Sequence, residues 1–568
     1  MKVLFCALHF GYFRNFESVI AALAERGHDV HLAADEADAL GGQALVERLK
    51  ARFPAGAGGS VTFGYAPSLD AEPWFKLARK LRMGADFVRY HDEPFTAFRK
   101  ARLNLTNQVP RAVRRMSERG PGASAAGRRV IGRALRAGEA LLPISEASRE
   151  FIEAQNPDVV LFASVSVWRA PQFDHLRAAR ALGRRTGICV FSWDHLSSKA
   201  FLRIVPDRLF VWNDTQQREA VEWHQIPAER VVMTGAQCYD QWFDRRPARD
   251  RDSFCRAVGL SAGQPFLLYV CSVMTPDPRE SQFVQRWIEA IRGSDDPALR
   301  QVGILVRPHP ERLAEWKSVD LERFGNVALH GRNPITPDAQ DDYFDSLYHS
   351  HAVAGLVTSA FIEAAVVGRP VHTLLLPEFE IYQEGVQHFR YLVEVAGGVL
   401  KVTRSFSDHL AQLGAALALP RQRDAQNERF VRAFVRPAGL DVPATPAFVA
   451  AVEELAAAAP LPAAVPGTAH HLLQPVVHLL ARSADSGWLR RAFRDTLEMT
   501  TDAVEEQKAG AKRAAAVDKA ERTAEKQRLL AAHRRRRQQQ RWMTAGRNWR
   551  KHVARLKGQV KELIGART

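Results

Sequence analysis

The chain has 568 residues, of which 46% are hydrophobic and 25% are charged, and it carries a formal net charge of +16. The composition is typical of a globular protein, and the length exceeds what one hydrophobic core supports, so at least two domains are expected. The five cysteines are scattered and form no CxxC pair, which argues against a disulfide framework or a zinc site and favours a reducing cytosol.

Targeting signals are not evident in the sequence. The apolar run after Lys2 breaks at His9 and is followed by Arg14 and Glu17, unlike a secretory signal. No stretch reaches the roughly 18 uncharged apolar residues that a membrane-spanning helix needs. Residues 501–568 contain 19 Lys and Arg and 7 Asp and Glu, and thus carry +12 of the total charge of +16. The sequence therefore predicts a cytoplasmic protein whose basicity belongs mainly to a tail.

The first 243 residues alternate between short apolar runs and helical patterns, which predicts a doubly wound parallel sheet. Asn15 is expected to cap the first helix, which ends at Gly27. The first turn contains a glycine but no GxGxxG pattern, so NAD or FAD binding is not indicated. The expected strands are 2–8, 29–33, 157–163, 186–191, 206–212 and 230–234, with helices at 147–155 and 175–183.

Two ionisable residues that follow strands of this domain are candidate general bases. His9 comes after the first strand, and an imidazole with a pKa near 6.5 suits removal of a hydroxyl proton at neutral pH. Asp194 comes after the strand 186–191. The alternatives are an ordinary loop histidine, and an aspartate that caps a helix or forms a salt bridge.

Residues 79–149 form a long basic segment with a helical pattern and a Gly/Ser-rich break at 120–127. We expect a helical excursion from the first domain. Its arginine-rich faces are most simply solvated surface, and the alternative is contact with an anionic acceptor or lipid.

The second half repeats the alternation after a charged linker, 244–251, which contains Pro247. Two similar doubly wound Rossmann-like domains, 1–243 and 244–455, place a cleft at the carboxyl ends of both sheets, where ligands bind in such folds. The expected strands are 264–271, 301–306, 326–330, 353–357 and 371–376, with helices near 343–349 and at 405–417 and a helical region at 421–459. A Pro/Ala-rich linker, 456–469, and a basic helical extension, 470–568, follow.

The stretch 353–371 combines a buried strand, a turn with Thr358 and Ser359, and a helix that ends at Gly368. A helix start offers free N–H groups to a phosphate, and Glu363 lies one turn further, within reach of a ribose hydroxyl. The alternative is a capped core helix with a solvated glutamate.

Arg307 and His309 follow another strand and are separated by a proline that stiffens the turn. Arginine binds phosphate oxygens in a bidentate way, and histidine adds a donor. The alternative is a turn histidine beside an ordinary surface arginine.

Together these motifs resemble glycosyltransferases of the two-Rossmann-domain (GT-B) architecture. The resemblance covers roughly residues 1–455 and is greatest to the branch with CDP-glycerol glycerophosphotransferases and capsule-polysaccharide transferases. It implies that Arg307 and His309 contact the donor phosphates, that a general base lies at the position of His9, and that Glu384 and His388 contact the donor sugar. The stretches that carry it are RVVMTGAQCYD (230–240), ILVRPHP (304–310) and TSAFIEAAVVGRPV (358–371), supported by SWDHLSSK (192–199) and QHFRYL (387–392).

The resemblance implies transfer of a sugar, or a polyol phosphate, from a nucleotide-activated donor to a surface-polysaccharide or lipid-linked acceptor. No DxD pair stands where a metal-dependent enzyme needs it, and Asp341 and Asp342 lie in a Pro/Asp-rich loop where helix capping is expected. We therefore expect no metal and no cofactor besides the donor. UDP-N-acetylglucosamine 2-epimerases share the fold and these motifs, so a nucleotide-sugar epimerase is an alternative.

A third alternative is a non-catalytic GT-B-like protein whose tail binds a membrane or nucleic acid. From Trp549 onward, apolar residues at 549, 553, 556, 560 and 563 share one face of a basic helix, a pattern that suits an anionic membrane surface. No motif supports nucleic-acid binding. The tail 501–568 thus predicts a peripheral location on the inner face of the cytoplasmic membrane. The alternatives are a solvated helical tail and a helix that forms a coiled coil with a partner.

Overall fold

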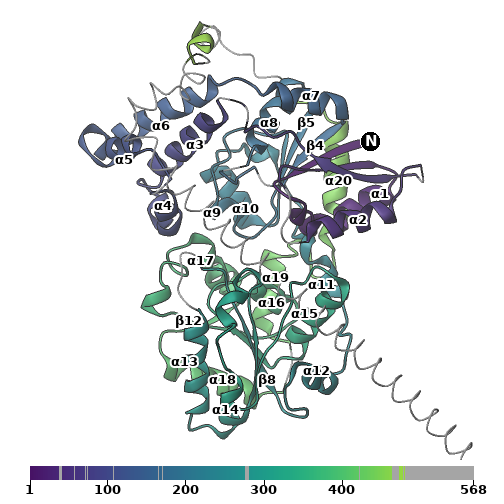
Figure 1. The fold of residues 1–568 in the computed structure, drawn as a ribbon, viewed down its shortest axis with the longest axis vertical. Helices are drawn as coiled ribbons and strands as arrows, with labels where there is room; N and C mark the ends of the chain where they lie inside the picture. Colours follow the sequence, from purple (N-terminus) through teal and green to yellow (C-terminus); the bar gives the residue numbers. More distant parts are fainter. Residues whose placement is uncertain are drawn as a thin grey trace, which may run out of the picture. The chain divides into compact units, whose positions relative to one another are not determined.

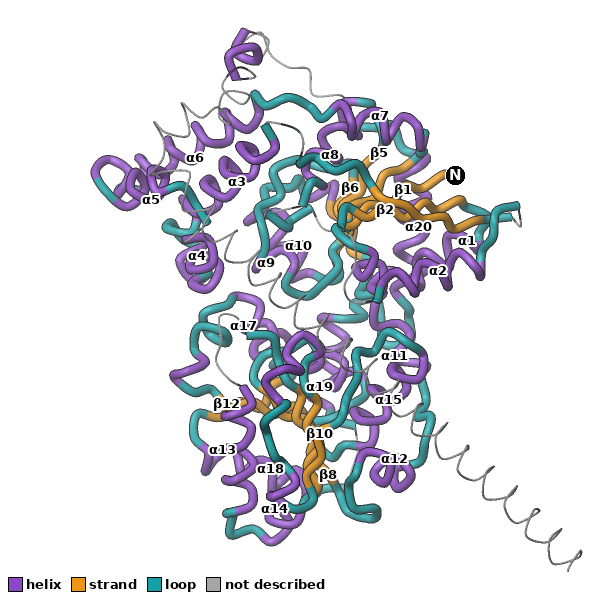
Figure 2. The backbone as a smooth tube through the Cα atoms, viewed as in Figure 1, coloured by secondary structure: helices purple, strands orange, loops and turns teal. Residues whose placement is uncertain are grey.

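Two parallel sheets organise the protein (Figures 1 and 2). The structure is a computed structural model, and it describes residues 1–36, 41–56, 58–70, 72, 74–106, 108–163, 165–168, 170–274, 280–420, 423–462, 472–477 and 479. The predicted tail 501–568 lies outside the described residues, as does most of the stretch 463–500.

The first sheet has seven strands within the described residues, in the order β3-β2-β1-β4-β5-β6-β7. The strands are β1 (Lys2–Ala7), β2 (Asp29–Ala34), β3 (Ser60–Tyr65), β4 (Val159–Phe162), β5 (Arg185–Cys189), β6 (Arg208–Val211) and β7 (Val231–Met233). All neighbours pair in parallel, and β4 is buried along its whole length. Helices cover both faces of such a sheet, which is why its strands read as continuous apolar runs.

Helices and short helical turns connect these strands. They are η1 (Phe10–Phe16), α1 (Glu17–Glu25), α2 (Gly42–Arg52), α7 (Glu146–Gln155), α8 (Gln172–Ala181), α9 (His195–Ser198), α10 (Asp214–Arg218), the π-helix η4 (Glu219–Trp223), η5 (Ala228–Arg230), η6 (Gln237–Tyr239) and α11 (Asp240–Asp244).

The second sheet has six strands in the described part of the chain, in the order β10-β9-β8-β11-β12-β13, all parallel. They are β8 (Phe266–Val270), β9 (Gly303–Arg307), β10 (Val327–Leu329), β11 (Ala352–Gly355), β12 (Val371–Leu374) and β13 (Leu400–Thr403). The helices are α12 (Arg251–Val258), α13 (Glu280–Arg292), α14 (Pro297–Gln301), η7 (Pro310–Trp316), η8 (Glu322–Phe324), α15 (Pro337–His349), α16 (Ala360–Val366), η9 (Pro377–Phe379), α17 (Gln387–Glu394), η10 (Val395–Gly397), α18 (Phe406–Ala418) and α19 (Ala425–Phe434).

The prediction of two doubly wound Rossmann-like domains is confirmed by these sheets. In both sheets the strand order reverses beside the first strand, between β1 and β4 and between β8 and β11. Ligands of open α/β sheets bind outside the carboxyl ends of the strands at such a reversal. His9 follows β1 and Thr358 follows β11, so both reversals carry predicted site residues.

The helix α20 (Ala444–Ala457) packs on the first sheet although it follows the second one in sequence (Figure 1). Phe448, Val452 and Leu455 are buried in the core that contains β1 and β4. Glu453 pairs with Arg26 at 2.6 Å. The boundary expected at residue 455 therefore assigns to the second domain a helix that packs in the first.

The excursion after β3 is helical, as its pattern suggested. It contains α3 (Phe75–Arg89), η2 (Phe95–Ala97), α4 (Arg99–Thr106), α5 (Arg111–Glu118), η3 (Gly120–Ala123) and α6 (Ala125–Ala140), and α3 packs against α6. Not every arginine here is solvated: Arg82 is fully buried and pairs with Glu139 at 2.6 Å and Asp174 at 2.8 Å.

Two expectations about helix capping differ from the structure. Asn15 does not cap the first helix, because it lies inside η1 and α1 begins at Glu17. Asp341 and Asp342 do not cap a helix either, since both lie well inside α15. Among the described residues, no helix is both long enough and apolar enough to cross a bilayer.

Candidate functional site

The predicted site residues follow the carboxyl ends of strands in both sheets. His9 and Asp194 follow β1 and β5 in the first sheet. In the second sheet, Arg307 ends β9 and His309 follows it, Thr358 and Ser359 separate β11 from α16, and Glu384 and His388 come after β12. The residues that the sequence predicted to follow strands, His9, Asp194, Arg307, His309, Thr358 and Ser359, therefore lie at or after the carboxyl ends of those strands.

Asp194 is held by hydroxyl groups and a lysine. Ser192 and Ser198 each donate a hydrogen bond to its carboxylate at 2.6 Å, and the Lys199 ammonium lies 3.2 Å from Oδ2. Burial alone would raise the pKa of Asp194, but the charge of Lys199, the nearby His388 imidazole and the two hydroxyl bonds outweigh it and hold that pKa well below its usual value. Asp194 is therefore an anion and a weak base.

His388 brings the second domain to the same place. It lies in the first turn of α17, and its ring packs edge-on against Trp193 of the first domain at a centroid distance of 4.6 Å. Burial lowers the pKa of His388 to about 4 despite the nearby charge of Asp194. The imidazole is therefore neutral at neutral pH.

His9 begins a row of aromatic rings in the first domain. Its ring lies 4.6 Å from that of Tyr12, Tyr12 meets Phe191 edge-on at 4.8 Å, and Phe191 lies 4.4 Å from His195. His195 accepts a hydrogen bond from the Phe191 backbone N–H at 3.2 Å, and burial lowers its pKa to about 3. His195 is thus a neutral packing residue, whereas His9 is partly exposed.

Glu363 lies in the first turn of α16 and accepts a short hydrogen bond from the Tyr343 hydroxyl. Burial raises the pKa of Glu363, and the Tyr343 bond and the positive charge of Arg14 oppose that rise. Arg14 comes from η1 of the first domain, is exposed, and acts on His309 as well. A charge of the first domain therefore acts on two predicted site residues of the second domain.

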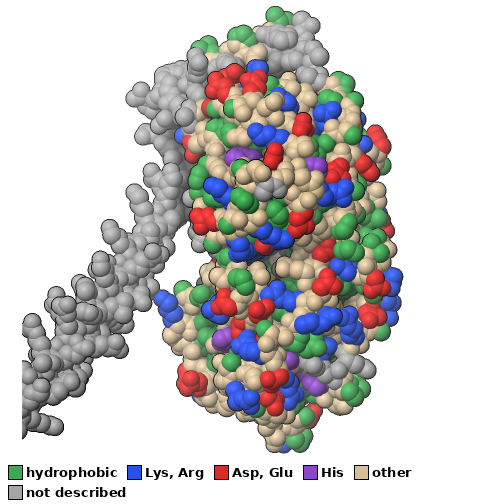
Figure 3. All heavy atoms as spheres, turned by 90° about the vertical axis from the view of Figure 1, so that its right-hand side faces the viewer, with side chains coloured by type: hydrophobic (Ala, Val, Ile, Leu, Met, Phe, Trp, Pro, Cys, Tyr) green, Lys and Arg blue, Asp and Glu red, His purple; other side chains and the backbone are tan. Residues whose placement is uncertain are grey.

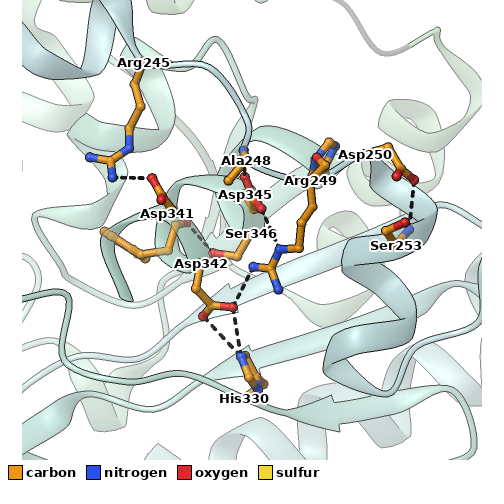
Figure 4. Close-up of polar contacts among 12 residues, drawn as sticks. Arg245, Ala248, Arg249, Asp250, Ser253, His330, Asp341, Asp342, Asp345 and Ser346 are labelled. Carbon is orange, nitrogen blue, oxygen red and sulfur yellow. Dashed lines mark hydrogen bonds and ion pairs between the residues drawn. The ribbon is translucent and has the colours of Figure 1, made fainter. Parts of the chain in front are cut away.

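Arg307 does not present a free guanidinium. It is 6% exposed and pairs with the Asp342 carboxylate at 2.9 Å. Asp342 also accepts hydrogen bonds from Arg249 at 2.9 Å and His330 at 3.1 Å (Figure 4). Burial opposes ionisation of Asp342, but these three donors keep its pKa well below its usual value. The charge of Arg307 is thus balanced within the second domain.

The same cluster fixes the linker between the domains. Arg249 bonds to Asp345 at 3.0 Å, the Ala248 backbone N–H donates to Asp345 at 2.9 Å, and Arg245 bonds to Asp341 at 2.7 Å (Figure 4). The acidic face of α15 therefore anchors the linker and balances Arg307 at the same time.

The remaining predicted residues have simple surroundings. His309 Nδ1 accepts a hydrogen bond from the Glu311 N–H at 3.2 Å, and burial lowers the pKa of His309. Thr358 accepts a weak bond from the Ala360 N–H at 3.3 Å. Ser359 is exposed at the start of α16 and makes no side-chain capping bond. Glu384 forms an exposed pair with Arg404 at 2.6 Å.

Sequence reasoning missed Lys100, Lys199 and Tyr343 as site residues. Lys199 lies inside the quoted SWDHLSSK stretch, which was a usable signal, and Tyr343 lies on a predicted helix. Lys100 belongs to the excursion helix α4, and nothing in its local sequence indicates that it reaches the site. Within the described ranges, no group of three His, Cys, Asp or Glu side chains is arranged to hold a metal ion.

Comparison with known proteins finds matches among solved structures and none among family models or curated sequences. No protein-family model and no curated protein sequence matches the chain. Among solved structures, it is similar to the UDP-GlcNAc 2-epimerase of Neisseria meningitidis bound to UDP-GlcNAc, with a TM-score of 0.46 and 13% identity over 80% of this chain and 100% of that chain.

Two further similarities are to transferases. A glycosyltransferase of Rickettsia africae aligns with a TM-score of 0.44 and 11% identity, over 80% of this chain and 98% of that chain. The wall teichoic acid polymerase TagF aligns with a TM-score of 0.41 and 9% identity, over 80% of this chain and 89% of that chain. At these TM-scores the similarities by themselves assign no function.

Proposed function

We propose that the protein is a glycosyltransferase that moves a sugar, or a polyol phosphate, from a nucleotide-activated donor to a surface-polysaccharide or lipid-linked acceptor. One observation carries this proposal: ionisable residues that follow strands of both sheets lie together. His388 of the second domain packs on Trp193 and faces Asp194 of the first. A site formed by residues of both domains suits a reaction between two substrates, because each domain can hold one of them.

The donor is proposed to bind the second domain. The hydroxyls of Thr358 and Ser359 and the imidazole of His309 are suited to the diphosphate, and Glu363 to the ribose. Arg307 was expected to grip phosphate directly, but its pair with Asp342 favours a positioning role for it. Glu384 and His388 are proposed to contact the donor sugar.

The acceptor hydroxyl is proposed to be activated by His9. Of the two predicted bases it is the better one, because the low pKa of Asp194 makes that carboxylate a weak proton acceptor. For a sugar donor, His9 takes the hydroxyl proton while the acceptor oxygen attacks the anomeric carbon. The bond from that carbon to the diphosphate breaks, and the nucleoside diphosphate leaves. We propose that no divalent metal is required.

A product assay tests this proposal. Purified protein is incubated with UDP-, CDP-, GDP- and ADP-activated donors and a lipid-linked acceptor extract, and nucleotide release and acceptor modification are both followed. The His9→Gln variant should lose about 10²–10⁴ in turnover with unchanged nucleotide affinity. The His28→Gln variant, which changes a histidine bound to Glu453, should keep full turnover. Full turnover of His9→Gln contradicts the proposal. Loss of wild-type turnover on addition of EDTA also contradicts it.

A nucleotide-sugar 2-epimerase is a second candidate, because carboxyl groups from both domains, Asp194 and Glu363, belong to the candidate site. An epimerase moves a proton off and onto the sugar, which needs acid–base groups around it. The discriminating measurement is incubation with UDP-N-acetylglucosamine and no acceptor. Formation of a new epimer under those conditions favours this candidate, and an unchanged substrate removes it.

A further inference from the structure

Two lysines lie near one carboxylate, and only one of them pairs with it. Lys199 follows α9 and pairs with Asp194 at 3.2 Å. Lys100 belongs to α4 of the helical excursion, and its ammonium interacts electrostatically with both Lys199 and Asp194. His388, from α17 of the second domain, interacts with all three of these groups. Two cations therefore surround a single anion.

The structure holds Lys100 in this position. Its backbone N–H donates to the Gly385 carbonyl at 3.2 Å, and its ammonium lies 4.4 Å from the centre of the Tyr382 ring. The preceding residue, Arg99, pairs with Glu380 at 2.6 Å. The start of α4 is thus fixed to the segment of the second domain that leads into α17. Lys100 is a fixed, half-buried cation and not a freely moving surface lysine.

The charges in this cluster do not balance. The carboxylate of Asp194 already pairs with Lys199 and accepts two hydroxyl hydrogen bonds. Among the described residues, the ammonium of Lys100 has no carboxylate within ion-pair distance. Burial and the charge of Lys199 lower the pKa of Lys100 to about 8. The ring of Tyr382 offsets only part of the cost of burial. One positive charge is left for an anion to neutralise.

A second group in the cluster also has unused hydrogen-bonding capacity. Nδ1 of His388 is buried and has no hydrogen-bond partner among the described residues, and the side chain is 9% exposed. A buried polar nitrogen without a partner costs free energy unless a ligand or water supplies one. Lys100 and His388 therefore offer donors to the same small region.

We propose that Lys100, Lys199 and His388 bind a phosphate group of a substrate, next to Asp194. A phosphomonoester carries nearly two negative charges, and the two phosphoryl groups of a donor diphosphate together carry two, so either matches two ammonium groups and an imidazole N–H better than a neutral hydroxyl does. The site deepens the proposed function and rests on it for the identity of the substrate. The phosphate belongs either to the donor diphosphate or to a phosphate-bearing acceptor or transferred group.

Phosphorus-31 NMR line broadening on the full-length protein tests the site, with inorganic phosphate and glycerol 3-phosphate as probes. Lys100→Met should weaken binding of both probes by about tenfold or more, whereas Lys100→Arg should retain most of the affinity. Lys76→Met, which removes an exposed lysine of α3, should change nothing and corrects for background binding to other basic residues. Thermal melting of each variant confirms that it is folded.

Unmeasurable phosphate binding by the wild type, or equal affinity in Lys100→Met and Lys76→Met, overturns the proposal. If Lys100-dependent binding persists with saturating nucleoside diphosphate, the site serves an acceptor or transferred phosphate. If nucleotide displaces the probes, the site serves the donor diphosphate. The proposed function is contradicted by a different result, namely the absence of both nucleotide binding and transfer. Lys100-dependent binding of the two probes can be measured whether or not nucleotide binding and transfer are found.

Discussion

The buried pair of Arg307 and Asp342 yields a prediction on stability. Removing one partner of a buried ion pair typically costs about 3–5 kcal/mol, because the other charge is left uncompensated. Asp342 keeps Arg249 and His330, so Arg307→Met should lower the free energy of unfolding by about 3 kcal/mol. The measurement is urea denaturation. Arg404→Met, which breaks the exposed pair with Glu384, is the control and should cost less than about 1 kcal/mol. Equal stabilities of the two variants would contradict a structural role for Arg307.

Glu219 yields a prediction on pH. Burial raises its pKa from 4.5 to about 8, although a hydrogen bond from Tyr391 of the second domain opposes the rise. The folded state therefore binds this proton more tightly than the unfolded state, so stability is greatest below about pH 4.5 and falls as the pH rises toward 8. The glutamine side chain in Glu219→Gln does not titrate, so it adds no such pH dependence to the stability.

The stability of Glu219→Gln relative to the wild type should therefore increase as the pH rises from about 5 to 8. The gain approaches about 1.4 kcal/mol for each pKa unit of the shift. Thermal melts of both proteins across this pH range measure the difference in their stability. The titrations of all other groups are common to both proteins and cancel in this difference. A difference that does not change with pH would show that Glu219 titrates normally.

The site was predictable where its residues follow strands, and not where they depend on distant partners. His9, Asp194, His309 and Ser359 stand directly after apolar runs, so their places at the sheet edges could be deduced. The pairing of Arg307 with Asp342 joins residues 35 positions apart, and no local pattern encodes it. The same holds for Lys100, whose neighbours Asp194, Lys199, Tyr382 and Gly385 are all distant in sequence.

At the level of elements, the return of α20 to the first sheet depends on close packing at Gly235. This glycine has φ +84°, and a Cβ added to it would lie 2.8 Å from the Ala444 Cβ at the start of α20. Gly259 has nearly the same φ, +86°, but a Cβ there would have no neighbour within 4 Å. Substitutions at the two positions therefore distinguish the cost of backbone strain, which is present at both, from the cost of steric contact, which is present at Gly235 and not at Gly259.

Gly259→Ala should cost about 1 kcal/mol from the left-handed backbone alone. Gly235→Ala should cost at least about 1 kcal/mol more, because Ala444 and the helix behind it must shift. Urea denaturation of the two variants gives the comparison. If both lose the same free energy, α20 is not tightly packed at its start.

The elements themselves were predicted unevenly. Strands such as β4 and β8 are buried on both faces, and their apolar runs were read correctly from the sequence. β3 and β13 were missed because each is only partly buried and mixes polar with apolar residues. The helix α17 was not among the expected helices. The packing of α20 on the first sheet depends on the whole fold and could not be deduced locally.

For the molecule as a whole, charge is distributed in two ways. Acidic and basic side chains are interspersed on the face drawn in Figure 3, in line with a net charge of only +4 over residues 1–500. The remaining +12 lies in residues 501–568, outside the described part. The sequence thus separates a nearly balanced body from a basic tail, and we propose that the tail holds the protein at the inner face of the cytoplasmic membrane.

Liposome co-sedimentation tests this location. The full chain should bind phosphatidylglycerol vesicles at moderate salt and not phosphatidylcholine vesicles, because each Lys or Arg near an anionic surface contributes about 1 kcal/mol. A truncation to residues 1–465 should stay in the supernatant with both. The membrane proposal is lost if the full chain and the truncation sediment equally.

We propose above all that the second domain binds the nucleotide of an activated donor next to residues of the first domain. Calorimetric titration of the wild type with UDP, CDP, GDP and ADP tests it most directly. We predict that at least one of these binds, and that Glu363→Ala weakens it by about tenfold or more while the control Glu378→Ala, at an exposed pair with Arg286, does not. Absence of binding by all four nucleotides, or equal affinity in the wild type and Glu363→Ala, would contradict the account.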